Sequence, residues 1–198
     1  MNLPQPRLGF SPQEYLEWEK LQETRNEYIA GEVFAMVGAT DAHNTVSGNL
    51  YMLFRTHLRG GPCRTFAVDM KLRLDSANCF FYPEVFVTCD PRDRTAESDY
   101  FKRHPILVAE VLSESTAAFD RGRKFGIYRE LESLREYVLV DPDRQSVEVF
   151  RRDPTDHWVL YPCGPGSDVE FASIGLRVPI GTIYEDVELP GVQQTAMQ

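Results

Sequence analysis

Two carboxylates and one lysine stand at positions where a protein fold rarely places a charge. Glu84 and Glu110 each interrupt an apolar run, and Lys124 is in line with Ile127 on the inward face of a predicted helix. Carboxylates are rarely buried unless they are paired or bind a metal. These residue types therefore indicate a site that binds a divalent cation, with a lysine beside it that can assist the reaction. Such a site is typical of a metal-dependent hydrolase.

The two carboxylates would face each other if their strands are neighbours in one sheet. Close carboxylates repel, so one takes up a proton unless a cation neutralises them. Mg²⁺ or Mn²⁺ suits all-oxygen ligation, and the backbone carbonyl of Val111 offers a further ligand. A metal-bound water could attack a phosphate, with Lys124 orienting or deprotonating that water. Periodicity alone leaves an alternative, a buried ion pair of Lys124 with Glu110 or with Asp120 at i,i+4 spacing.

The length and composition of the chain favour one globular domain. The chain has 198 residues, of which 42% are hydrophobic and 26% are charged. This length is enough for one sizeable core and short for two domains. We expect a single domain over residues 1–198, with its core at about 11–189 and a flexible tail at 190–198.

The predicted location is the cytoplasm. No stretch approaches the roughly 18 consecutive apolar residues of a membrane span, and residues 1–10 lack a signal-peptide core. The four cysteines show no CxxC pair and no metal-ligand spacing, so in a reducing compartment we expect free thiols. They are Cys63, Cys79, Cys89 and Cys163.

The predicted elements run helix, strands, helix, strands, which gives a mixed α/β fold with one central sheet. A capping box at Ser11 opens the first helix, and Thr40 or Asp41 caps a longer one. The polar segment 89–103 is predicted to be a flexible flap. The predicted strands are 27–37 with a turn at 30–31, then 65–74, 80–88, 106–112, 135–140, 146–151 and 158–161, and a helix is predicted at 119–131.

One histidine near these elements has two interpretations. His43 lies in the first turn of the longer helix, in line with Val46 and Leu50. This position favours a core or capping histidine over a metal ligand.

Four segments in order carry a resemblance to a known family. They are 81–85 (FYPEV), 107–116 (LVAEVLSEST), 120–125 (DRGRKF) and 136–142 (EYVLVDP). Together they resemble the Uma-type family of predicted endonucleases, which belongs to the PD-(D/E)xK, restriction-endonuclease-like superfamily. The resemblance covers about residues 15–189.

The resemblance implies a restriction-endonuclease-like core and a role for each charged residue. Glu84 would stand at the first acidic metal-ligand position and Glu110 at the second, with Lys124 as the superfamily lysine moved onto the following helix. Glu32 matches an acidic position of the family and would assist metal or water binding. The family usually has aspartate where this chain has Glu84. The extra methylene matters because Mg²⁺ demands near-ideal octahedral geometry at about 2.0–2.1 Å.

Two functions from different classes follow. The first is a Mg²⁺-dependent endonuclease that hydrolyses phosphodiester bonds of DNA, acts as a homodimer and has no membrane partner. Its association with DNA would depend strongly on salt. The alternative is a catalytically degenerate nuclease-fold module that binds nucleic acid or a protein without cleavage. The net charge of −9 and the glutamate at position 84 favour this second function. A hydrolase of another phosphate ester is a third possibility.

Overall fold

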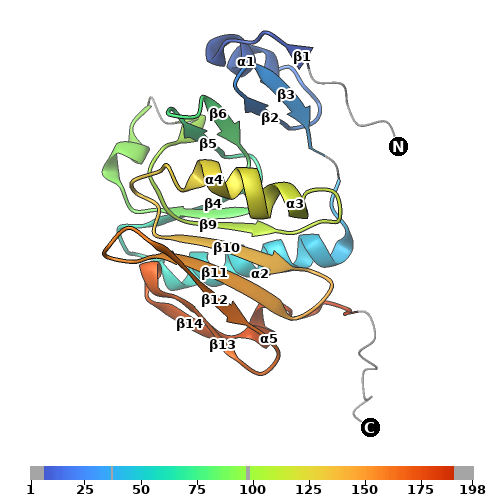
Figure 1. Cartoon of the computed structure of the whole chain (residues 1–198), viewed down its shortest axis with the longest axis vertical. Coiled ribbons are helices and arrows are strands. Elements are labelled where there is room, and N and C mark those ends of the chain that lie inside the picture. The colour runs from blue at the N-terminus through green and yellow to red at the C-terminus, as the bar shows by residue number, and fades with distance from the viewer. Residues whose placement is uncertain (1–6, 37, 97–98, 190–198) are drawn as a thin grey trace.

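Two six-stranded sheets and a two-stranded hairpin form the framework of the molecule (Figure 1). The computed structural model describes residues 7–36, 38–96 and 99–189. Within these ranges the sheets are flanked by helices, which confirms the predicted mixed α/β class.

The first sheet, here called the central sheet, has the strand order β12-β11-β10-β9-β7-β4. Its β9 and β10 are parallel, and its other neighbouring strands are antiparallel. Its strands are β4 (Arg64–Ala67), β7 (Val85–Thr88), β9 (Pro105–Val111), β10 (Glu136–Asp141), β11 (Ser146–Arg152) and β12 (Trp158–Cys163).

The second sheet has the order β1-β3-β2-β6-β5-β8 and packs beside the central one. Its β2 and β3 form the predicted hairpin, with Ala30 and Gly31 at positive φ in the turn. Its strands are β1 (Arg7–Leu8), β2 (Asn26–Ile29), β3 (Glu32–Ala35), β5 (Lys71–Leu74), β6 (Cys79–Phe81) and β8 (Phe101–Lys102).

The helix α2 (Asp41–His57) covers one face of the central sheet. Its stripe of Val46, Leu50 and Phe54 at i, i+4 and i+8 is fully buried against the apolar side chains of that face, as the periodicity predicts. Thr40 caps the helix, its hydroxyl accepting the N–H of His43 at 3.2 Å.

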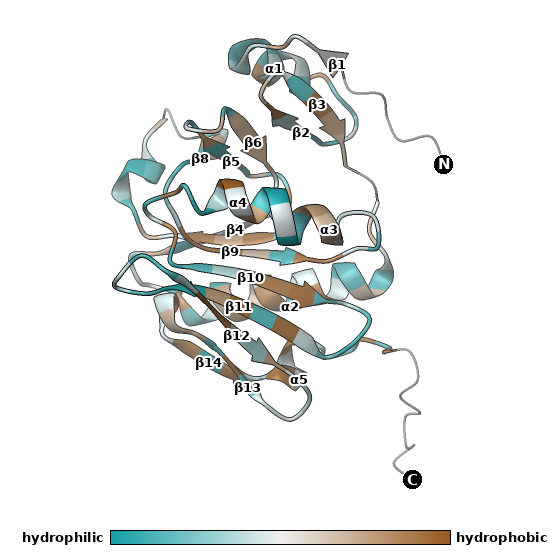
Figure 2. Cartoon of the chain, in the orientation of Figure 1, coloured by the Kyte–Doolittle hydropathy of each residue, from teal (hydrophilic) through white to brown (hydrophobic). Residues whose placement is uncertain are grey.

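The opposite face of the central sheet is covered by a short helical stretch with an irregular middle. It runs from α3 (Ala117–Phe119) through a π-helical turn (Asp120–Lys124) into α4 (Phe125–Tyr128). Figure 2 shows this turn as a hydrophilic patch between more apolar helical ends. The second sheet packs over the same side, so this stretch lies between the two sheets.

The remaining elements are short. The helix α1 (Pro12–Glu19) begins with the predicted capping box: the Ser11 hydroxyl accepts the Glu14 N–H, and the Glu14 carboxylate accepts the Ser11 N–H. The others are the 3₁₀ helices η1 (Pro91–Arg94) and η4 (Ala172–Ile174), the hairpin β13 (Asp168–Phe171) and β14 (Leu176–Pro179), and α5 (Ile180–Ile183).

Two predicted strands are each divided between the two sheets, so a second six-stranded sheet accompanies the predicted central one. The stretch 65–74 becomes β4 and β5, with Val68 at φ +58° between them. The stretch 80–88 becomes β6 and β7, with residues 82–84 as the crossover. Alternation of side chains continues through both stretches, so the sequence pattern does not reveal the change of sheet.

The prediction of free thiols is wrong for two of the four cysteines. Arg64 pairs with Thr88 in the β4–β7 ladder, which places Cys63 and Cys89 opposite each other with their Cα atoms 4.0 Å apart. They form a disulfide, whereas Cys79 and Cys163 are free. The spacing of 26 residues could not indicate this, because the bond depends on which strands pair.

The segment predicted as a flexible flap is anchored by a buried carboxylate. Asp93 accepts hydrogen bonds from the Thr88 hydroxyl at 2.8 Å and from the backbone N–H groups of Arg103 and His104 at 2.9 and 3.0 Å. The predicted tail at 190–198 lies outside the described residues. In the described ranges, no helix is long and apolar enough to cross a membrane.

Candidate active site

Glu84 and Glu110 lie close together: Glu110 belongs to β9, and Glu84 immediately precedes β7, the antiparallel neighbour of β9. The ladder ends where Val85 of β7 pairs with Ala109 of β9, and each glutamate is the next residue of its chain segment beyond this last pair. Their face is the one covered by α3 and α4, because Phe86 and Val108 of the same face pack there. The Glu84 carboxylate accepts the Val111 N–H at 3.3 Å.

Lys124 projects from the π-helical turn into this pair of carboxylates. Its Nζ lies 2.9 Å from Glu110 Oε1 and 3.5 Å from Asp120 Oδ1. The side chain of Lys124 is 7% exposed and that of Glu110 is 3% exposed. π-helical turns occur frequently at functional sites, and this one turns Asp120 and Lys124 inward together. The ion-pair alternative is thus present in the structure, and it includes both predicted acidic partners.

A third acidic partner of Lys124 comes from a strand that sequence reasoning did not assign to the site. Glu27 of β2 lies with Oε1 3.1 Å from Lys124 Nζ, and the same oxygen accepts the Tyr82 N–H at 3.2 Å. The sequence signal that could have indicated this role is the position of Glu27, a charged residue among apolar residues of the hairpin, five positions before Glu32. Among the described residues, no ion pair joins Glu32 to Lys124, and the role of Glu32 stays a prediction.

The environment of this cluster changes the proton affinities of its members. The pKa of Glu110 lies well above its ordinary value. Burial is the main cause, the Lys124 ammonium acts in the opposite direction, and the nearby Glu84 carboxylate raises the pKa further. Burial lowers the pKa of Lys124, but the charges of Glu110 and Glu27 outweigh burial and raise that pKa well above its ordinary value. Lys124 is therefore an ammonium in this arrangement, which does not favour the predicted deprotonation of water by its amine.

Tyr128 closes the apolar side of the cluster. Its hydroxyl donates a hydrogen bond of 3.1 Å to Glu110 Oε1, the oxygen that also binds Lys124. Burial, together with the charge of Glu110, raises the pKa of the Tyr128 hydroxyl well above its ordinary value. The hydroxyl therefore stays protonated and serves as a fixed donor.

His43 reaches the same place from the first turn of α2. Its Nε2 lies 2.9 Å from the Val111 carbonyl oxygen and 3.5 Å from Glu84 Oε1. Burial lowers the pKa of the imidazole, against smaller raising effects of the Val111 carbonyl and Glu110. The histidine is thus a neutral group in contact with two predicted metal ligands, where sequence reasoning favoured a core or capping role.

The charge balance of the cluster leaves negative charge uncompensated. Three carboxylates contact a single ammonium, the fourth, that of Glu84, lies beside Glu110, and each of these side chains is less than one-fifth exposed. Oxygen donors of this kind suit Mg²⁺ or Mn²⁺, so the donor set fits a divalent cation. Within the described ranges, no group of three His, Cys, Asp or Glu side chains is arranged to hold a metal. The Oε1 atom of Glu110 already contacts Lys124 and Tyr128, so this oxygen would have to turn toward an ion.

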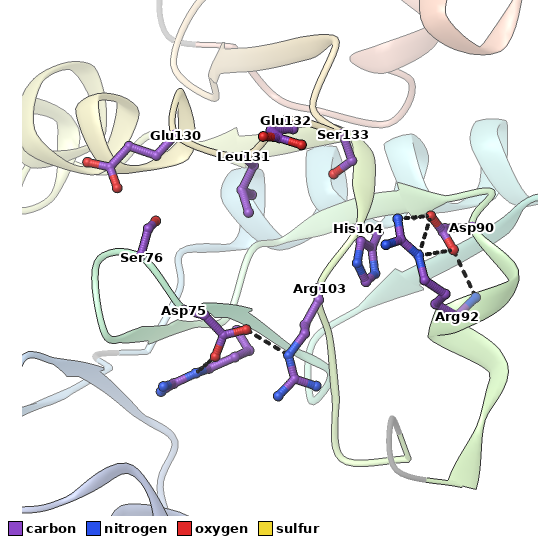
Figure 3. A pocket seen from close by; sticks show the side chains of 11 residues that line it. Asp75, Ser76, Asp90, Arg92, Arg103, His104, Glu130, Leu131, Glu132 and Ser133 are labelled. Atoms are coloured by element: carbon purple, nitrogen blue, oxygen red, sulfur yellow. Dashed lines mark hydrogen bonds and ion pairs between the residues drawn. The ribbon is translucent and has the colours of Figure 1, made fainter.

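A separate polar pocket of about 470 Å³ lies near the beginning of β9 (Figure 3). His104 lines it, and six residues of extended strand place Glu110 roughly 20 Å away. Its arginines already pair with its aspartates: Arg73 and Arg103 bind Asp75, and Arg92 binds Asp90. The pocket shares no residue with the carboxylate cluster, and its compensated charges indicate no particular ligand.

Several proteins are similar to this chain. Two uncharacterized proteins of Synechocystis sp., slr1290 and sll1609, are 38% and 34% identical over 181 and 160 residues. The matches cover 91% and 80% of this chain and 93% and 90% of the relatives. The crystal structure of a "putative nuclease belonging to DUF820" from Anabaena variabilis matches with a TM-score of 0.71 at 18% identity. This match covers 89% of this chain and 98% of that one, and it supports the fold alone.

A family model extends over nearly all the elements that build the cluster. The family Uma2, described as "putative restriction endonuclease", matches residues 12–179. That range includes β2, the N-terminus of α2, the β7–β9 pair and the π-helical turn. The predicted resemblance is confirmed, and the chain belongs to the Uma2 family.

Proposed function

We propose that this protein is a metal-dependent nuclease that hydrolyses phosphodiester bonds of DNA with Mg²⁺ or Mn²⁺. The observation that carries the proposal is the cluster of three carboxylates in contact with one buried ammonium, with the Glu84 carboxylate beside them. Such a cluster must take up protons or bind a cation. The name of the family and that of the structural neighbour, a "putative nuclease", support phosphodiester hydrolysis as the reaction.

The Glu84 and Glu110 carboxylates and the Val111 carbonyl would hold the ion. A bound divalent cation polarises phosphoryl oxygens and lowers the pKa of a bound water. The chain's own residues do the rest. Lys124, held as an ammonium, donates hydrogen bonds to phosphate oxygens and stabilises the charge that develops there. Glu27 fixes the position of Lys124 and is itself fixed by the Tyr82 N–H. Glu32 would assist from the neighbouring strand β3.

A second candidate function is a nuclease-fold module that binds nucleic acid or a protein without cutting. Two observations favour it. Lys124 already occupies the space between Glu110 and Glu27, and no group of three acidic or metal-binding side chains is arranged for an ion in the described ranges. In this function, Lys124 would act only as the counter-charge of the cluster.

Calorimetric titration of Mn²⁺ separates the two functions. The protein would be titrated with and without a short DNA duplex, beside Glu84→Ala and Glu110→Gln variants whose folding is checked by circular dichroism. Glu132→Ala, an exposed glutamate of the remote pocket, is the matched control. We expect binding in the parent and the control and loss of binding in both site variants. Absence of binding to the parent with DNA present would refute the nuclease and leave the binding module.

We further propose that the protein acts on DNA as a homodimer, because double-strand cleavage needs two sites and a two-fold dimer supplies them. Sedimentation velocity with and without a duplex measures the assembly. Affinity measured across a series of salt concentrations tests the phosphate contacts, which should weaken steeply as salt rises.

A further inference from the structure

His43 reaches the C-terminal end of β9 from the face of the central sheet opposite α3 and α4. The helix α2 lies on the face of the central sheet opposite α3 and α4 (Figure 1), yet its first turn abuts the C-terminal end of β9. The Thr40 hydroxyl fixes this turn by accepting the N–H of His43. The imidazole is therefore held by a rigid element and not by a loop.

The surroundings of the ring determine which nitrogen carries the proton. Nε2 faces two acceptors, the Val111 carbonyl oxygen at 2.9 Å and Glu84 Oε1 at 3.5 Å. A lone pair at Nε2 would repel both oxygens, so the proton is on Nε2. Nδ1 is then an unprotonated acceptor, buried without a hydrogen-bond partner in the part of the chain that the structure describes. The opposite tautomer would bury an unpartnered N–H, which costs more.

We propose that His43 is a positioning residue of the cation site: its single Nε2–H donates a hydrogen bond to the Val111 carbonyl, lies close to the Glu84 carboxylate, and keeps both oxygens where they would bind the ion. This inference rests on the proposed function and adds a residue that acts through the two oxygens. The N–H supplies partial positive charge between two oxygens before a cation arrives. It therefore lowers the cost of bringing them together.

A direct bond from His43 to the ion fits the structure less well. A histidine that binds a metal uses an unprotonated nitrogen and nearly always donates its other N–H to a carboxylate, a carbonyl or water. Here Nδ1 has no such partner among the described residues. Removing a residue that orients metal ligands typically lowers the metal affinity about 10–100-fold. That is the loss we expect without the Nε2–H.

The experiment compares two substitutions by Mn²⁺ calorimetry with a DNA duplex present. His43→Gln keeps an N–H donor on a side chain of similar reach, and His43→Leu fills the space without one. We expect His43→Leu to bind Mn²⁺ about 10–100-fold more weakly than the parent and His43→Gln to restore most of that loss. Equal binding by the parent and His43→Leu would overturn the inference and leave the proposed function intact. Absence of binding to the parent would overturn both.

Two spectroscopic measurements on the parent do not depend on how the variants fold. Ring ¹⁵N shifts in the metal-free protein should show the neutral tautomer protonated at Nε2, and protonation at Nδ1 would overturn the inference. Pulsed electron paramagnetic resonance of bound Mn²⁺ should show no directly coordinated histidine nitrogen. A strong coupling to His43 would overturn the positioning role, because it would identify the histidine as a ligand.

Discussion

Replacing Lys124 by methionine tests whether the buried ammonium holds the carboxylate cluster together. Methionine has a similar length and no charge, so the change removes the ion pairs at 2.9 and 3.1 Å to Glu110 and Glu27 and leaves the carboxylates buried. Breaking a buried ion pair by removing one partner costs about 3–5 kcal/mol. For a chain of this length, 1 kcal/mol shifts the melting temperature by about 2–4 °C. The expected loss is therefore about 6–20 °C.

The loss of stability in Lys124→Met should depend on pH, because the carboxylates that remain buried can take up protons. The pKa of Glu110 is raised in the folded protein, so the folded state binds more protons than the unfolded chain between the two pKa values. Stability from this group is complete below the unfolded value, about 4.3, and declines as pH rises through the folded value. Lys124→Met removes the effect that lowers this pKa. The variant should therefore be only slightly less stable than the parent at acidic pH, and the difference in stability should grow toward pH 8.

The assay is thermal unfolding followed by circular dichroism at several pH values, with Lys20→Met as the matched control. Lys20 lies 2.9 Å from Glu17, the same distance as in the buried pair, but both side chains are about half exposed. Exposed pairs contribute about 0–1 kcal/mol, so the control should melt within a few degrees of the parent. Equal losses in the two variants, or a Lys124→Met deficit that does not change with pH, would refute the argument.

Three further outcomes follow from the same contacts. Lys124→Met should bind Mn²⁺ at least as tightly as the parent, because a neighbouring positive charge is gone. The same variant should lose plasmid cleavage, and unchanged cleavage would contradict the role given to the ammonium. Glu27→Gln should retain Mn²⁺ binding and lower the cleavage rate, since only the position of Lys124 is loosened; parallel losses of binding and cleavage would instead place Glu27 among the ligands. Reducing the Cys63–Cys89 disulfide should cost about 3.5 kcal/mol for a 26-residue loop, and an unchanged melting temperature in reducing agent would contradict the pairing.

The local elements could be predicted because their signals are local. The capping box at Ser11, the cap at Thr40 and the apolar stripe of α2 are patterns within a few residues, and each forms as predicted. The proximity of Glu84 and Glu110 could also be predicted, because two apolar strands close in sequence tend to pair. Their shared face follows from strand alternation.

What sequence could not supply depends on contacts between distant segments. The crossover at residues 82–84 moves the chain from one sheet to the other, and this crossover brings β2 over the helix that carries Lys124. Without that packing, Glu27 is an ordinary charged residue of a hairpin. The Cys63–Cys89 disulfide has the same cause, because it requires the β4–β7 pairing. His43 was assigned to a core or capping role because its contact with Val111 spans 68 residues.

The position of the lysine follows from the shape of the helical stretch and not from the strand. Position 112, immediately after β9, is leucine and belongs to the apolar cluster between the sheets. The ammonium instead comes from the π-helical turn, which carries Asp120 and Lys124 on its buried side. π-helical turns are rare overall but frequent at functional sites, and burying three carboxylates around one ammonium carries a desolvation cost. A fold that needed only packing would place apolar side chains there, and this is the reason for proposing a cation site at the cluster.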